Sequence, residues 1–147
     1  MSAPRIRALA LCVFHHQGKI LVNQFHDADA NKTLFRPIGG GIEFGERSVD
    51  AIAREVQEEL NQPITAVQLL GTLESIFTYA GKPGHEFVQV FDAQFSDPSL
   101  YEQPWLIGHE SDGAPFKATW RDSSSFSADS PLVPEGLYDL LKAAKLL

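Results

Sequence analysis

Three consecutive glycines, Gly39 to Gly41, precede the clearest helical pattern of the chain. Within Ser48–Leu60, apolar side chains recur at intervals of three and four residues, which places them on one face of an α-helix. These side chains are Val49, Ile52, Ala53, Val56 and Leu60. Ser48 suits the N-cap position, and Asn61 followed by Pro63 predicts the helix end. The glycines ahead of this helix would let backbone approach a ligand closely.

The other regular patterns are those of β-strands. Apolar runs bounded by turn residues predict strands over residues 6–15, 19–25, 34–38, Ile64–Tyr79, 86–95 and 116–120. Residues 97–113 contain prolines and glycines and predict an irregular excursion or lid. Residues 134–147 predict a C-terminal helix. Several strands with two helices favour an α/β or α+β fold in which helices cover a mixed sheet.

Length and charge narrow the classes of protein that this chain can represent. A chain of 147 residues fits one domain, residues 1–147. Its single cysteine, Cys12, lies in an apolar run, so we expect a buried, inert thiol and no disulfide or Cys-rich zinc site. The net charge of −7, with basic residues scattered singly, argues against duplex nucleic acid as a partner. We also expect no membrane span and no signal peptide, and therefore a cytoplasmic location.

Three carboxylates crowd one side of the predicted helix. Glu55, Glu58 and Glu59 are three and four residues apart, so they are neighbours on the helix surface. Like charges at this spacing repel each other unless a cation lies among them, and such oxygen ligands suit Mg²⁺ or Mn²⁺. The alternative is a solvated acidic face on which Arg54 and Glu58 form an ordinary ion pair. The charge pattern alone favours that alternative.

The spacing of the whole segment changes this balance, because it resembles that of a known family. Residues 40–62 resemble the Nudix box, in which a glycine, a glutamate, an Arg-Glu pair and a Glu-Glu pair follow at fixed intervals. The matching residues are Gly40, Glu46, Arg54, Glu55, Val56, Glu58 and Glu59. Asn61 and Gln62 stand where a glycine and an aliphatic residue usually close the box. The segment 36–40 before the box and the late Trp120 also resemble the family, so the similarity covers most of the chain.

This resemblance implies a Nudix-type α/β/α sandwich with a mixed β-sheet. It implies a hydrolase of phosphoric anhydride bonds that acts on a small, nucleotide-type substrate: a nucleoside diphosphate linked to another group X. The cofactor it implies is Mg²⁺, with Mn²⁺ as a substitute. Glu46 and Arg54 resemble the pair that locks a loop to the helix. The alternative is a catalytically silent module of the same fold that binds a nucleotide as a sensor.

The resemblance also implies roles for the acidic residues of the box. Glu58 and Glu59 resemble metal ligands, and Glu55 resembles either a third ligand or the residue that holds the attacking water. The carbonyl of Gly39 resembles the backbone ligand. A metal at these residues would neutralise the diphosphate charge and lower the pKa of bound water.

Residues outside the box are further candidates. Relatives often recruit another carboxylate from a loop, and Glu110 is our first choice for this ligand, with Glu102 second; the alternative for both is a solvated loop residue. Arg36 could reach a phosphate, or form a surface salt bridge. Tyr79 resembles a base-stacking residue of relatives that act on diadenosine polyphosphates. The alternation of Phe77 and Tyr79 favours the alternative, packing within a strand. Many relatives pair through their sheets, so the resemblance leaves a homodimer open, and no motif of this sequence decides the oligomeric state.

Overall fold

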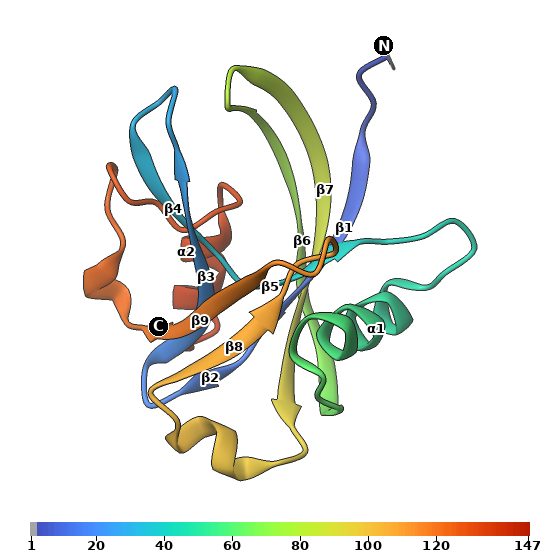
Figure 1. Cartoon of the computed structure of the whole chain (residues 1–147), viewed down its shortest axis with the longest axis vertical. Coiled ribbons are helices and arrows are strands. Elements are labelled where there is room, and N and C mark those ends of the chain that lie inside the picture. The colour runs from blue at the N-terminus through green and yellow to red at the C-terminus, as the bar shows by residue number, and fades with distance from the viewer. Residues whose placement is uncertain (1–2) are drawn as a thin grey trace.

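The computed structural model describes residues 3–147, and over that range the chain forms two β-sheets and two α-helices (Figure 1). The first sheet has the order β5-β1-β7-β6, with bounds Ile38–Gly41, Arg7–Val13, Lys82–Phe95 and Ile64–Tyr79. Strands β1 and β7 run parallel, whereas the β5–β1 and β6–β7 pairs are antiparallel. This sheet is therefore mixed, as predicted.

The second sheet is antiparallel. Its order is β2-β3-β9-β8, and β4 pairs with β3; the bounds are His15–His16, Lys19–Asp27, Pro115–Arg121, Trp105–His109 and Lys32–Arg36. Only Pro37 separates β4 from β5, so the chain passes directly from the second sheet into the first. The end of β4 and the start of β5 therefore lie where the two sheets meet.

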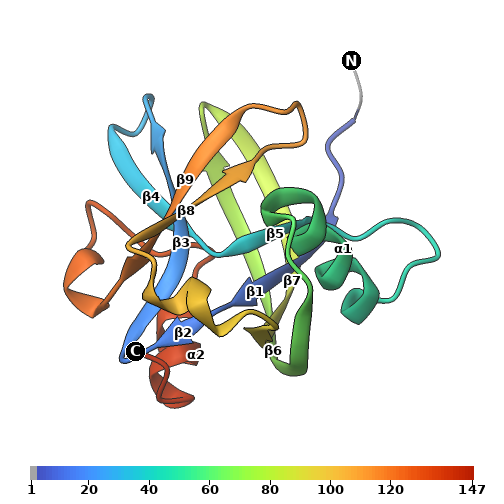
Figure 2. The same ribbon diagram turned by 60° about the horizontal axis from the view of Figure 1, so that its bottom comes forward.

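Strand β1 is apolar because both of its faces are buried. Successive side chains of a strand point to opposite faces. One face places Ala10 and Cys12 in a cluster with α1 (Ser48–Leu60), and the other places Leu9 and Leu11 in a cluster with α2 (Leu137–Ala143). Figure 2 shows the two helices on either side of β1. The mixed sheet lies between helices, which confirms the predicted sandwich.

Helix α1 has the predicted bounds, but its buried face differs from the predicted stripe. Its buried residues are Ala51, Ile52, Val56 and Leu60. Val49 and Ala53 are exposed, so the predicted stripe is wrong at these two positions. Arg47 rather than Ser48 occupies the N-cap position and forms no side-chain cap hydrogen bond. Asn61 ends the helix in the left-handed conformation with φ 56°, as predicted.

The glycine triplet belongs to a strand, which the sequence did not predict. The expected strand 34–38 divides into β4 and β5, and Gly39, Gly40 and Gly41 pair with β1. Glycine has a low strand propensity, so pattern alone could not indicate this pairing. A Cβ on Gly39 would overlap the carbonyl oxygen of Ala10, so the close approach of β5 to β1 requires glycine there.

Residues 97–113 are more regular than predicted. They contain the short 3₁₀-helix η1 (Pro98–Glu102) and strand β8, which pairs with β9. Pro104 precedes β8 and does not interrupt it. Gly108 lies so close to the ring of Phe116 that a Cβ would collide with it. The residues that suggested a loop are therefore compatible with a strand.

Helix α2 is shorter than the predicted helix over residues 134–147. Gly136, with φ 88°, precedes α2, and Lys145, with φ 61°, follows it. Left-handed residues at both positions interrupt the helical backbone. The predicted apolar side is retained in the buried Leu137 and Leu141. None of the helices within residues 3–147 is both long enough and apolar enough to cross a membrane.

Candidate functional site

Arg54 joins helix α1 to the loop before it. Its Nε donates to Oε2 of Glu46 at 2.7 Å, and its Nη2 donates to Oε1 at 2.9 Å. The same Nη2 donates to the carbonyl oxygen of Gly41 at 3.0 Å. The hydrogen bonds from Arg54, with one from the backbone N–H of Glu43, lower the pKa of Glu46 to about 2. The structure thus brings together the two residues that the sequence predicted as a loop-to-helix lock.

Arg54 also contacts two of the helix carboxylates. Its Nη1 donates to Oε1 of Glu55 at 3.0 Å and to Oε2 of Glu58 at 3.2 Å. The ordinary ion pair of Arg54 with Glu58 is therefore present, but Glu46 lies closer. The side chain of Glu58 is 57% exposed, whereas that of Glu55 is 14% exposed. Arg54 therefore offsets part of the repulsion among the acidic residues of α1.

Glu55 and Glu59 lie against the glycines of β5. The backbone N–H of Gly39 donates to Oε2 of Glu59 at 3.1 Å. A Cβ on Gly40 would lie 2.6 to 2.8 Å from the carboxylate of Glu55. Helix α1 can therefore bring Glu55 this close to the strand only because residue 40 is a glycine.

The environment disfavours the charge on both of these carboxylates. Burial, followed by the negative charge of Glu55, raises the pKa of Glu59 to about 8, although Arg36 opposes this shift. Burial also raises the pKa of Glu55, which Arg54 opposes. Partly buried carboxylates with like-charged neighbours are costly to ionise. A cation beside them would relieve this cost.

A small pocket connects Glu59 with residues from the second sheet. Arg36 at the end of β4, Glu110 directly after β8 and Asn23 in β3 line it together with Glu59 and Gly39. Nδ2 of Asn23 lies 3.4 Å from Oε1 of Glu110. Four of these residues, namely Arg36, Gly39, Glu59 and Glu110, are candidates from the sequence, and they come from three separate segments of the chain.

Asn23 is the residue of this pocket that sequence reasoning missed. The available signal was one polar residue directly after the apolar run Ile20 to Val22. Such a residue is common on the exposed face of a strand, and only the pairing of β3 with its neighbours shows what it faces.

Two other candidates lie elsewhere. Tyr79 ends β6, and its ring packs edge-on against Phe25 with the centroids 5.7 Å apart. Glu102 is exposed in η1. Within residues 3–147, neither side chain belongs to the lining of the Glu59 pocket, whereas Glu110 does. A role for Tyr79 in base stacking stays a prediction.

The carboxylates of α1 and the backbone of Gly39 can be compared with the ligands that a metal ion needs. Within the described range 3–147, no three His, Cys, Asp or Glu side chains gather closely enough to enclose an ion. Arg54 engages Glu55 and Glu58, and Gly39 engages Glu59. The donor set nevertheless fits a hard divalent cation, because it consists of carboxylates beside glycine backbone.

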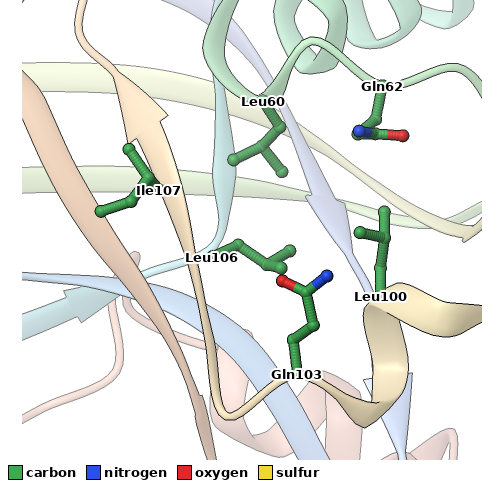
Figure 3. Close-up of a pocket in the computed structure, with 6 residues that line it drawn as sticks. All are labelled: Leu60, Gln62, Leu100, Gln103, Leu106 and Ile107. Carbon is green, nitrogen blue, oxygen red and sulfur yellow. The ribbon is translucent and has the colours of Figure 1, made fainter.

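A second pocket, of about 240 Å³, opens at the end of α1 (Figure 3). Its lining consists of apolar and amide side chains: Leu60, Gln62, Leu100, Gln103, Leu106 and Ile107. Those residues include no titratable group, so this pocket cannot supply acid–base chemistry. It is distinct from the pocket of Glu59, even though Leu60 directly follows Glu59 in the chain.

Comparisons with known proteins identify a family and a shared fold. A family model described as the NUDIX domain matches residues 3–123. A MutT NUDIX hydrolase from Burkholderia pseudomallei is 18% identical with a TM-score of 0.63, and the match covers 94% of this chain and 97% of that one. The E. coli ORF135 protein is 20% identical with a TM-score of 0.54, and the match covers 97% and 94%. A NUDIX hydrolase from Nitrosomonas europaea is 20% identical with a TM-score of 0.51, and the match covers 82% and 74%. At these identities, the structures show a shared fold.

Proposed function

The chain belongs to the Nudix family, and from this premise we propose that it is a pyrophosphohydrolase that requires Mg²⁺, or Mn²⁺ in its place. Nudix hydrolases act on pyrophosphate bonds, so the predicted reaction class is confirmed. The finer proposal concerns the metal and the substrate, which we take to be a nucleoside diphosphate linked to another group X.

One observation carries the proposal: Glu55 and Glu59 lie together against the glycine backbone of β5. The protein holds two carboxylates where burial raises the pKa of each. A solvated acidic helix face would not be pressed against a strand in this way. The arrangement is costly for the protein alone and becomes favourable when a divalent cation shares the site.

The other residues of the site have separate proposed roles in metal binding and proton transfer. Glu59, Glu58 and the carbonyl of Gly39 would hold the metal, and Glu55 would be a further ligand or would accept the proton of the attacking water. Glu110 would add a carboxylate from the second sheet. A bound divalent cation supplies charge neutralisation on the diphosphate and a lowered pKa for water.

Arg36 would bind a substrate phosphate. It lines the same pocket as Glu59 and Glu110, and its positive charge opposes the raised pKa of Glu59. A guanidinium matches the geometry of phosphate oxygens. Arg36 would therefore contact the diphosphate from the same pocket in which Glu59 and Glu110 would hold the metal.

The test is product release from a panel of substrates. The panel should contain nucleoside triphosphates, dinucleoside polyphosphates, nucleotide sugars and ADP-ribose, each assayed with Mg²⁺ and with EDTA. We expect cleavage of a phosphoric anhydride with Mg²⁺ and none with EDTA. Nucleotide binding without turnover of any substrate would contradict the proposal and would favour the silent sensor module.

A further inference from the structure

The main chain of Glu110 is fixed by the turn that joins β8 to β9. Its N–H donates to the carbonyl oxygen of Ala114 at 2.8 Å, and its carbonyl oxygen accepts from the N–H of Gly113 at 2.9 Å. The position of its carboxylate depends on side-chain contacts. Within residues 3–147, the hydrogen-bond donor to this carboxylate is Nδ2 of Asn23, at 3.4 Å.

Asn23 occupies a junction between strands. On one side of β3 it pairs with Arg36 of β4, and on the other side with Ala118 of β9. Side chains of directly paired residues lie on the same face of a sheet, about 5 Å apart at Cβ. Asn23 and Arg36 therefore lie side by side on one face of the sheet, the Asn23 amide reaches Glu110, and all three residues line the Glu59 pocket.

We propose that Asn23 is a positioning residue, whose side-chain amide holds the carboxylate of Glu110 toward Glu59. This inference rests on the proposed function, in which Glu110 serves the metal. An amide N–H suits the task because it binds a carboxylate without neutralising it. Residues that orient a metal ligand contribute to metal affinity and rate, although they touch neither metal nor substrate.

A first experiment uses the metal-free protein and needs no activity. The side-chain amide resonances of Asn23 are recorded in ¹H–¹⁵N spectra of the wild type and of Glu110→Gln. We expect a shift at Asn23 and no shift at Gln24, the next residue of the same strand, whose Oε1 accepts from Arg121. Unchanged Asn23 resonances would overturn the proposal.

A second experiment measures Mn²⁺ affinity and steady-state kinetics. Asn23→Ala should weaken Mn²⁺ binding and lower kcat about tenfold, while Gln24→Ala should match the wild type. In the Glu110→Gln background, Asn23→Ala should cause little further loss of Mn²⁺ affinity or kcat, because both changes disrupt the same contact between Asn23 and Glu110. Full additivity, or a rise in KM alone, would overturn the proposal and indicate a direct contact between Asn23 and substrate.

Two outcomes distinguish the role of Glu110 from that of Asn23. If Glu110→Gln binds Mn²⁺ and turns over like the wild type, Glu110 has no role at the metal, and the inference about Asn23 falls with it. If Glu110→Gln is impaired but Asn23→Ala is not, only the inference about Asn23 is wrong. The proposed Mg²⁺-dependent hydrolysis is judged separately, on the wild-type protein.

Discussion

The guanidinium of Arg54 binds both carboxylate oxygens of Glu46, at 2.7 and 2.9 Å. Oε1 of Glu46 also accepts the backbone N–H of Glu43 at 3.1 Å. The loop between β5 and α1 is therefore tied to the helix through one arginine. Because the same arginine contacts Glu55 and Glu58, a change in its contact with Glu46 should also affect the acidic residues of the site.

Replacement of Arg54 by alanine should affect stability and activity together. The change removes the contacts to Glu46 and Gly41 and leaves Glu55 and Glu58 to repel each other. We expect a lower Tm and a roughly 10- to 100-fold lower kcat, the range typical for residues that orient metal ligands. Arg54→Lys should recover only part of both, since lysine cannot form the two-pronged contact. A loss of rate at unchanged Tm would instead place Arg54 in contact with substrate.

The low pKa of Glu46 predicts a pH dependence of stability. Its folded pKa of about 2 lies below the usual 4.5, so the carboxylate stabilises the fold fully above pH 4.5 and loses this effect as the pH falls toward 2. The free energy of unfolding of the wild type should exceed that of Glu46→Gln by a constant amount near neutral pH. Urea unfolding at decreasing pH should show the difference shrinking in that window.

The control for this prediction is the same substitution in the Arg54→Ala background. The hydrogen bond from Arg54 is the largest cause of the lowered pKa of Glu46, so without Arg54 most of the shift should disappear. Arg54→Ala and the double variant Arg54→Ala/Glu46→Gln should therefore differ far less in the acid dependence of their unfolding free energies. If the difference in unfolding free energy between the wild type and Glu46→Gln stays constant down to a pH of about 2, the contact between Arg54 and Glu46 does not stabilise the fold as proposed.

Helix α1 was predictable from the sequence because local signals agree there. Ile52, Val56 and Leu60 follow the helical period, and Asn61 supplies the left-handed end. The stripe was wrong at Val49 and Ala53 because the packing of α1 on β5 and β1, not the helix alone, decides which side is buried.

Strands β5 and β8 could not be predicted in the same way. The glycines of β5 have a low strand propensity, yet they pair with β1. At Gly39 and Gly40, the carbonyl of Ala10 and the carboxylate of Glu55 leave no room for a Cβ. Gly108 of β8 likewise fits the ring of Phe116. Asn23 belongs to the same class, because its neighbours come from β4 and β9. These features depend on contacts between distant segments.

The glycine at position 40 offers a sharp test of the contact between helix and strand. A Cβ there would meet the carboxylate of Glu55, so Gly40→Ala should displace Glu55. A displacement of about 1 Å at a catalytic group can cost on the order of a hundredfold in rate. Gly41→Ala is the matched control, because its Cβ would meet only Nη2 of Arg7, at 3.5 Å. Equal kcat values for the two variants would refute this account of Gly40.

The identity of X can be approached through Tyr79. If this residue stacks on a base, Tyr79→Ala should raise the KM for a dinucleoside polyphosphate about tenfold and spare kcat, since stacking contributes roughly 1 to 3 kcal/mol. Phe25→Leu is a useful comparison, because it disturbs the edge-on packing but keeps the tyrosine. An equal loss on all substrates, with a lower Tm, would assign Tyr79 to packing alone.

Glu59 is the residue on which the proposed metal site depends most. Its folded pKa of about 8 lies above the usual 4.5, so its ionisation costs stability as the pH rises through this interval. Glutamine resembles the neutral acid and can still accept the N–H of Gly39. Metal-free Glu59→Gln should therefore melt at or above the wild-type Tm at a pH of about 8, which separates a loss of function from a loss of fold.

The most direct test is the turnover of Glu59→Gln at saturating Mg²⁺, on a substrate that the wild type cleaves. We expect kcat to fall by about a hundredfold or more, because the variant lacks one anionic ligand of the metal. A kcat equal to that of the wild type would contradict the assignment of the site to the carboxylates beside β5.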